Sequence, residues 1–165
     1  NKINFYFVTL FGIGKIKKIP GSFASLATTL FLFFLFYVLN VLPSIVLISV
    51  IIIFFVSLYG INNYTKNLDN KDPKEVVIDE FIGQSIPIYL YEISHGTEKS
   101  FNDAIIFYII IFFLFRFFDI IKPFPISYFD KKHKNSFGVI MDDVMAGLYV
   151  VLVLIVFMVI KKLIF

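Results

Sequence analysis

The sequence predicts an all-α polytopic membrane protein, a helical bundle with about five membrane segments in a single domain covering residues 1–165. Two observations predict this class. Of the 165 residues, 59% are hydrophobic and only 16% are charged, whereas a soluble domain carries about 25% charged residues. The apolar residues also form runs of about 20, the length that a helix needs to cross a bilayer, and the lysines cluster between such runs.

The first half of the chain predicts two spans joined by an uncharged turn. Residues 1–13 are mixed in polarity and are expected to lie at the membrane interface. Ser22 is predicted to cap the first spanning helix, 23–42, because a serine at this position can accept hydrogen bonds from free backbone N–H groups. Pro43 turns the chain, and the second span covers 44–61.

A third apolar segment, 76–93, follows a polar stretch with a helix-start pattern. Asp72 would be the N-cap, Pro73 would take the first helical position, and Glu75 would reach back as in a capping box. We therefore expect a helix that begins before the apolar segment and continues into it.

The segment 76–93 is predicted to be a broken helix. Pro87 would kink it, because proline lacks the backbone donor and its ring collides with the preceding turn. Asp79 and Glu80 lie about one and a half turns into the expected helix, where solvation does not easily explain two adjacent carboxylates. The alternative is a re-entrant or surface helix whose carboxylates meet water.

The fourth span, 104–121, ends in a charged stretch. Arg116, Asp119 and Lys122 follow at i, i+3 and i+6, so they lie close to one helix face. A proline directly after Lys122 stops the helix, because the residue before a proline avoids the α conformation. Charge in such an apolar run indicates a functional site, although an ion pair that neutralises itself at a helix end is the alternative.

The last span, 138–160, carries Asp142 and Asp143 near its start. Carboxylates in a first helical turn are favoured by the helix dipole. This placement therefore has a structural explanation as well as a functional one.

The lysines predict the topology. Basic residues gather in 15–18, 66–74 and 131–134, whereas the connections near 40–44 and 92–103 are nearly free of lysine. The positive-inside rule then favours five crossings with the N-terminus inside. All the charged residues of the spans would lie near the cytoplasmic ends of their helices. Lysines between apolar runs suit anionic lipid head groups, not nucleic acid.

Five carboxylates at one depth repel one another unless a cation lies among them. Oxygen ligands without cysteine or a histidine cluster suit a hard cation, so Mg²⁺ is the predicted cofactor. The predicted metal ligands and catalytic groups are Asp79, Glu80, Asp119, Asp142 and Asp143. The predicted phosphate-binding residues are Arg116, Lys122 and Ser22. These residues predict metal-dependent phosphoryl chemistry on a lipid head group or a similar anion, with water activated by the metal or by a carboxylate.

Four blocks of the sequence resemble the phosphatidylglycerophosphatase A family of bacterial membrane lipid phosphatases. In the family's order they are 14–26 (GKIKKIPGSFASL), 72–84 (DPKEVVIDEFIGQ), 115–126 (FRFFDIIKPFPI) and 138–147 (GVIMDDVMAG). The first block departs from the family's usual residues at four positions, namely Lys17, Ile19, Ser22 and Ala24. The acidic blocks match the family's pattern.

The resemblance implies Mg²⁺-dependent hydrolysis of phosphatidylglycerophosphate to phosphatidylglycerol and phosphate. It also implies a location in the bacterial inner membrane, with the active site facing the cytoplasm. The alternative is a small ion-coupled membrane transporter with a carboxylate site, because broken helices with intramembrane carboxylates are typical of that class too. A transporter's site should lie near the bilayer midplane, whereas these charges are expected at one end of the bundle.

Overall fold

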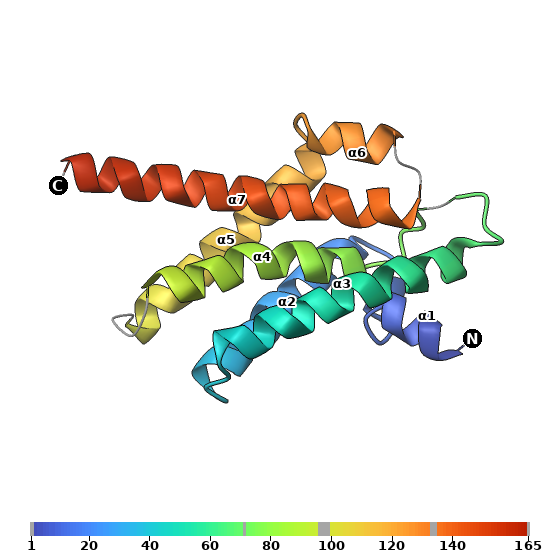
Figure 1. Cartoon of the computed structure of the whole chain (residues 1–165), viewed down its shortest axis with the longest axis horizontal. Helices are drawn as coiled ribbons and strands as arrows, with labels where there is room; N and C mark the ends of the chain where they lie inside the picture. Colours follow the sequence, from blue (N-terminus) through green and yellow to red (C-terminus); the bar gives the residue numbers. More distant parts are fainter. Residues whose placement is uncertain (1, 71, 96–99, 133–134, 165) are drawn as a thin grey trace.

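The computed structural model describes residues 2–70, 72–95, 100–132 and 135–164, and this part of the chain contains helices and turns but no strand. The predicted all-α class is confirmed. In chain order the elements are α1 (Lys2–Val8), the 3-10 helix η1 (Ile13–Lys15), α2 (Pro20–Tyr37), α3 (Pro43–Thr65), α4 (Ile78–His95), α5 (Phe101–Ile121), α6 (Ile126–Lys132) and α7 (Ser136–Ile164) (Figure 1).

Among the described residues, four helices are long and apolar enough to cross a membrane. They are α2, α3, α5 and the stretch Ser136–Ile160 of α7. Their outward faces carry many exposed apolar side chains, such as Phe55, Phe113 and Leu152. Exposure of this kind is costly in water but not against lipid tails, which are equally apolar.

α4 lies at the centre of the bundle, in contact with α2, α3, α5 and α7. Because other helices enclose it, α4 can carry Asp79, Glu80, Gln84 and Ser85 without presenting them to lipid. This enclosure explains why its composition is more polar than that of the four candidate spans. The structure has one continuous helix of 18 residues with Pro87 inside it, so the segment is not divided into two helices.

α4 begins later than the sequence predicted. It starts at Ile78, and the carbonyl of Pro73 instead accepts a hydrogen bond from the Val76 N–H (2.9 Å) in a turn. The carboxylate of Glu75 accepts a hydrogen bond from the Tyr64 hydroxyl (2.8 Å). The predicted capping box, with Asp72 as N-cap, is therefore wrong, because α3 supplies a different partner for the glutamate.

The observed helix boundaries show which of the two acidic pairs the helix dipole stabilises. Asp79 and Glu80 lie in the first turn of α4, where the dipole and the free N–H groups favour carboxylates. α7 begins at Ser136, so Asp142 and Asp143 lie in its second turn. Since the dipole effect fades beyond the first turn, it does not account for the pair on α7.

The start of α2 differs from the prediction, whereas the end of α5 agrees with it. α2 begins at Pro20, and its N-cap is Ile19, which has a left-handed backbone (φ 49°). The prediction that Ser22 caps this helix is therefore wrong, since Ser22 lies within the first turn. α5 ends at Ile121, and Lys122 follows as a left-handed C-cap, so the predicted stop before the proline is confirmed.

α4 and α7 approach each other closely at two glycines. A Cβ atom at Gly83 would lie 2.5 Å from the carbonyl oxygen of Asp143, and a Cβ atom at Gly147 would overlap the carbonyl oxygen of Gly83. Small residues at a helix crossing allow two backbones to come into contact. This crossing brings the beginning of α4 against Asp143.

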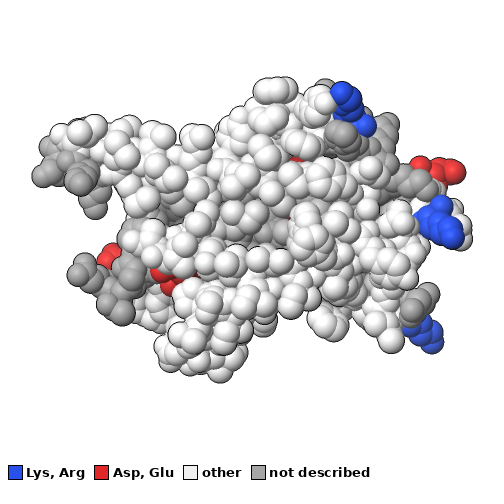
Figure 2. All heavy atoms as spheres, in the orientation of Figure 1, with Lys and Arg blue, Asp and Glu red and all other residues white. Residues whose placement is uncertain are grey.

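The directions of the helices bring the lysines of several connections to one end of the molecule. Figure 1 shows that α2, α4 and α7 run in the same direction, away from the end that carries the N-terminus, while α3 and α5 return toward it. On the face drawn in Figure 2, the lysines coloured blue lie at that same end, whereas acidic side chains also show at the opposite end.

Candidate active site

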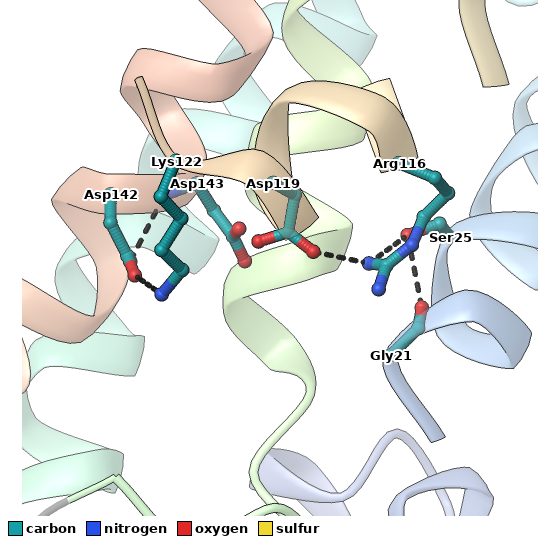
Figure 3. A network of polar contacts seen from close by, with 7 residues as sticks. All are labelled: Gly21, Ser25, Arg116, Asp119, Lys122, Asp142 and Asp143. Carbon is teal, nitrogen blue, oxygen red and sulfur yellow. Dashed lines mark hydrogen bonds and ion pairs between the residues drawn. The ribbon is translucent and has the colours of Figure 1, made fainter. Parts of the chain in front are cut away.

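The ends of four helices meet at the candidate site, which Figure 3 shows from close by. α2 and α4 contribute their beginnings, α5 contributes its last two turns and C-cap, and α7 contributes its second turn. All five acidic residues predicted from the sequence lie on these segments, as do the two predicted cations.

Three of the five carboxylates form a compact cluster. Asp79, Glu80 and Asp143 each offer one oxygen, and these oxygens lie within 4.8 Å of one another. Asp79 is only 7% exposed and Asp143 only 3%. Neighbouring negative charges in such a buried place repel one another strongly.

The cluster fits a hard divalent cation. One oxygen of Asp79 and one of Glu80 are buried and find no hydrogen-bond partner within the described ranges. A buried carboxylate without a partner is costly unless a metal or another cation neutralises it. The donors are all oxygens, the ligands that Mg²⁺ prefers.

The other two carboxylates are paired with cations of the chain itself. Asp119 Oδ2 lies 2.7 Å from Arg116 Nη1, and both side chains are 14% exposed. Asp142 Oδ2 lies 2.6 Å from Lys122 Nζ. The set predicted as five equivalent carboxylates is therefore divided into a cluster of three and two ion pairs. Figure 3 shows the two ion pairs, with Asp143 between them.

Arg116 is also held by α2. Its Nη1 donates to the Ser25 hydroxyl (3.3 Å), and this hydroxyl donates to the carbonyl of Gly21 (3.0 Å). The buried Nε of Arg116 has no acceptor among the residues the structure describes. The guanidinium therefore keeps a donor that an anion in the site could use.

The sequence predicted Ser22 as a phosphate-binding residue and did not predict a role for Ser25. The structure places the contact with Arg116 at Ser25, which is fully buried. A serine in the middle of an apolar helix was the available signal. Gly21, one turn earlier, leaves room for the site, because a Cβ atom there would overlap Glu80 Oε1 and lie 3.3 Å from Arg116 Nη1.

Comparisons with known proteins identify the family of the chain. Residues 6–158 match the family model described as phosphatidylglycerophosphatase A. A protein of that name from Haemophilus influenzae is 38% identical over 143 residues, which is 87% of this chain and 81% of that protein. Its Escherichia coli namesake is 28% identical over 137 residues, 83% of this chain and 73% of that protein.

A third relative has another name. A protein from Bacteroides thetaiotaomicron, provisionally named a phosphatidylinositol-3-phosphatase, is 35% identical over 101 residues, 61% of this chain and 57% of that protein. No solved structure matches the chain. The family model covers most of the chain, and the resemblance found in the four sequence blocks is thereby confirmed. The chain belongs to the phosphatidylglycerophosphatase A family and is a phosphatase.

Proposed function

We propose that this phosphatase removes the terminal phosphate of phosphatidylglycerophosphate, yielding phosphatidylglycerol and inorganic phosphate, and that it uses Mg²⁺. The observation that carries the proposal is the buried cluster of Asp79, Glu80 and Asp143 beside two cations. The names of the relatives from Haemophilus influenzae and Escherichia coli support the choice of substrate.

Asp79, Glu80 and Asp143 are the residues that would hold the metal ion. When bound, a divalent metal supplies positive charge against the phosphate oxygens and makes nearby water a better nucleophile. The three carboxylates fix the position of that charge, because they lie on two helices locked together at Gly83 and Gly147.

Arg116 and Lys122 would bind the phosphate that is removed. The planar guanidinium can donate two parallel hydrogen bonds to phosphate oxygens, and the ammonium adds a second positive charge. Asp119 and Asp142 hold these two side chains in place. Either carboxylate could also take a proton from the attacking water as a general base. Ser22, in the first turn of α2, remains a further candidate for phosphate binding.

The proposed site lies at head-group depth on the cytoplasmic side of the bacterial inner membrane. Asp79 is the second residue of α4, and Asp119 is the third from the end of α5, so both are within roughly 5 Å of a helix end. We propose five crossings by a single domain, with α4 as the enclosed one. A lipid could then present its head group while its acyl chains stay in the bilayer.

A transporter fits these observations less well. Substrate sites of secondary transporters lie near the bilayer midplane, at the interface of repeated halves. Here the acidic cluster lies at helix ends, and the match to a phosphatase family covers residues 6–158. We therefore retain hydrolysis as the proposed function.

The test is phosphate release by the purified protein in a neutral detergent, with phosphatidylglycerophosphate as substrate. We expect the native chain to release inorganic phosphate and the Asp79→Asn variant to release almost none. Asp69→Asn is the matched control, because Asp69 is an exposed carboxylate in the connection before α4 and should retain full activity. A folded native protein that releases no phosphate from this lipid would rule out the proposed substrate.

A further inference from the structure

A second, basic pocket lies beside the acidic site. Its volume is about 350 Å³, and it lies between the turn at η1, the start of α2 and the turn that precedes α4. The residues that line it are Gly14, Lys15, Ile16, Lys17, Pro20, Lys74 and Glu75. Three lysines thus share this pocket with one carboxylate, which gives it an excess of positive charge.

The walls of this pocket are held by contacts between segments distant in sequence. A Cβ atom at Gly14 would overlap the backbone carbonyl of Glu75, so the two turns touch through their main chains. Glu75 also accepts the hydrogen bond from the Tyr64 hydroxyl (2.8 Å). Lys15 Nζ lies 4.6 Å from the centre of the Phe5 ring, a cation–π contact that restrains this side chain.

Only the first turn of α2 separates the basic pocket from the acidic cluster. Pro20 lines the pocket, and the next residue, Gly21, lies against the Glu80 carboxylate and Arg116. On the other wall, Glu75 precedes Asp79 by four residues. A ligand that reaches both places therefore needs two anionic groups a short distance apart.

The substrate of the proposed function has this chemistry. Phosphatidylglycerophosphate carries a terminal phosphomonoester and, one glycerol unit away, the phosphodiester that joins the head group to the diacylglycerol. Phosphodiesters of membrane lipids lie at the interface, where lysine side chains at helix ends meet them. The flexible glycerol allows the terminal phosphate to turn inward to the carboxylates.

We infer that the pocket of Lys15, Lys17 and Lys74 binds the phosphodiester of the lipid, while the acidic site with Arg116 and Lys122 takes the terminal phosphate. This inference rests on the proposed function and extends it. The basic pocket would add affinity for any lipid that carries this phosphodiester, and the acidic site would add the requirement for a terminal phosphate beyond it.

The test compares two double variants by steady-state kinetics in neutral mixed micelles. Lys17→Ala/Lys74→Ala removes two exposed lysines of the pocket. Lys18→Ala/Lys132→Ala is the matched control, because it removes two exposed lysines that do not line the pocket. Each variant is assayed with phosphatidylglycerophosphate, and inhibition by inorganic phosphate and by short-chain phosphatidylglycerol is measured in the same assay.

We expect the pocket variant to raise KM for the lipid roughly tenfold, as loss of two charged contacts predicts, with kcat nearly unchanged. Its Ki for phosphatidylglycerol, which has only the diester, should rise by a similar factor, while its Ki for inorganic phosphate stays the same. The control variant should change none of these constants. A charge-reversed pair, Lys17→Glu/Lys74→Glu, should strengthen the same pattern.

Three results would overturn the inference. One is an unchanged KM in the pocket variant. Another is an equal rise of KM in the control variant, which would mean general attraction to anionic lipid. The third is an equal rise in Ki for inorganic phosphate, which would place the lysines at the terminal phosphate. Failure of the proposed function is a separate outcome, because the native protein would then release no phosphate from this lipid.

Discussion

At the scale of single residues, the site separates two kinds of negative charge. Asp119 and Asp142 are neutralised by Arg116 and Lys122, whereas the cluster of three carboxylates contains oxygens for which the described residues provide no partner. The paired carboxylates are neutralised within the chain. The clustered carboxylates need a cation from outside the chain.

This division predicts that neighbouring aspartates respond differently to the same substitution. Asp143→Asn removes a member of the cluster and should lower kcat by about 100-fold or more, because the metal charge is no longer held in place. With Asp119 as the general base, Asp142→Asn removes only the partner of Lys122 and should cost roughly tenfold, the value of a charge-assisted hydrogen bond of about 1.5 kcal/mol. The measurement is phosphate release at saturating lipid and Mg²⁺. Equal losses in both variants would contradict the division.

Arg116 provides a second test at this scale. Arg116→Lys keeps the charge but loses the planar fork, so we expect kcat/KM to fall by the equivalent of about 2–3 kcal/mol. Arg116→Met should lose at least as much. The thermal unfolding midpoint of each variant in detergent provides the control for folding. If Arg116→Lys were fully active, the arginine would serve only as the counter-ion of Asp119.

The sequence predicted which residues to consider and one pair within a helix, but it did not predict which carboxylates meet across two helices. Spacing along α5 placed Arg116 and Asp119 on one face, and the ion pair between them follows from that local geometry. Which carboxylates meet across α4 and α7 depends on how the two helices are rotated against each other. Residues Gly83 and Gly147 set that contact, and they are far apart in the sequence.

At the scale of elements, tertiary contacts determined where α4 begins. The pattern from Asp72 to Glu75 is a good helix start by local rules, but Tyr64 binds the glutamate and Val8 accepts a hydrogen bond from Val77 (3.0 Å). A helix-start rule that uses only neighbouring residues does not take into account hydrogen-bond partners on α1 and α3. The stop of α5 at Lys122 was predictable because the following proline acts locally.

The crossing of α4 and α7 can be tested at Gly83. An alanine there would place its Cβ against the backbone of Asp143, at 2.5 Å from the carbonyl oxygen, so the helices must move apart. We expect a loss of about 1–3 kcal/mol in stability, as for other overpacked sites, and a larger proportional loss of activity because Asp79 and Asp143 separate.

Gly60→Ala is the matched control for this substitution. Its Cβ would lie 3.0 Å from the amide oxygen of Asn4 and 3.3 Å from the Phe7 ring, which are side chains that can shift. Both variants are compared by thermal unfolding and by phosphate release. If Gly83→Ala proved as stable and as active as Gly60→Ala, the close crossing would not be what assembles the cluster.

At the scale of the whole molecule, the enclosed position of α4 explains why hydropathy alone selects four spans. α2, α3, α5 and α7 face lipid, but α4 faces mainly other helices and so can be more polar. The all-α class was predictable from composition, and the gathering of lysines at one end was predictable from their pattern along the sequence. The central place of α4 was not, because it depends on packing among all the long helices.

The five-crossing topology can be tested with single cysteines, since the chain has no cysteine of its own. Asn67 and Asn102 are both exposed, in the connections before α4 and at the start of α5. In intact spheroplasts, an impermeant thiol reagent should label Asn102→Cys but not Asn67→Cys. Opening the membrane should expose both. Equal labelling of the two from outside would contradict a crossing by α4.

The central claim, that the buried carboxylates of α4 and α7 hold a metal ion needed for hydrolysis, is tested most directly by titrating the metal. Phosphate release from phosphatidylglycerophosphate is measured after removal of metals with EDTA and then at increasing Mg²⁺. We predict no turnover in excess chelator, full recovery with Mg²⁺, and a requirement for more Mg²⁺ in Asp143→Asn but not in Asp69→Asn. Full turnover in excess EDTA would contradict the account.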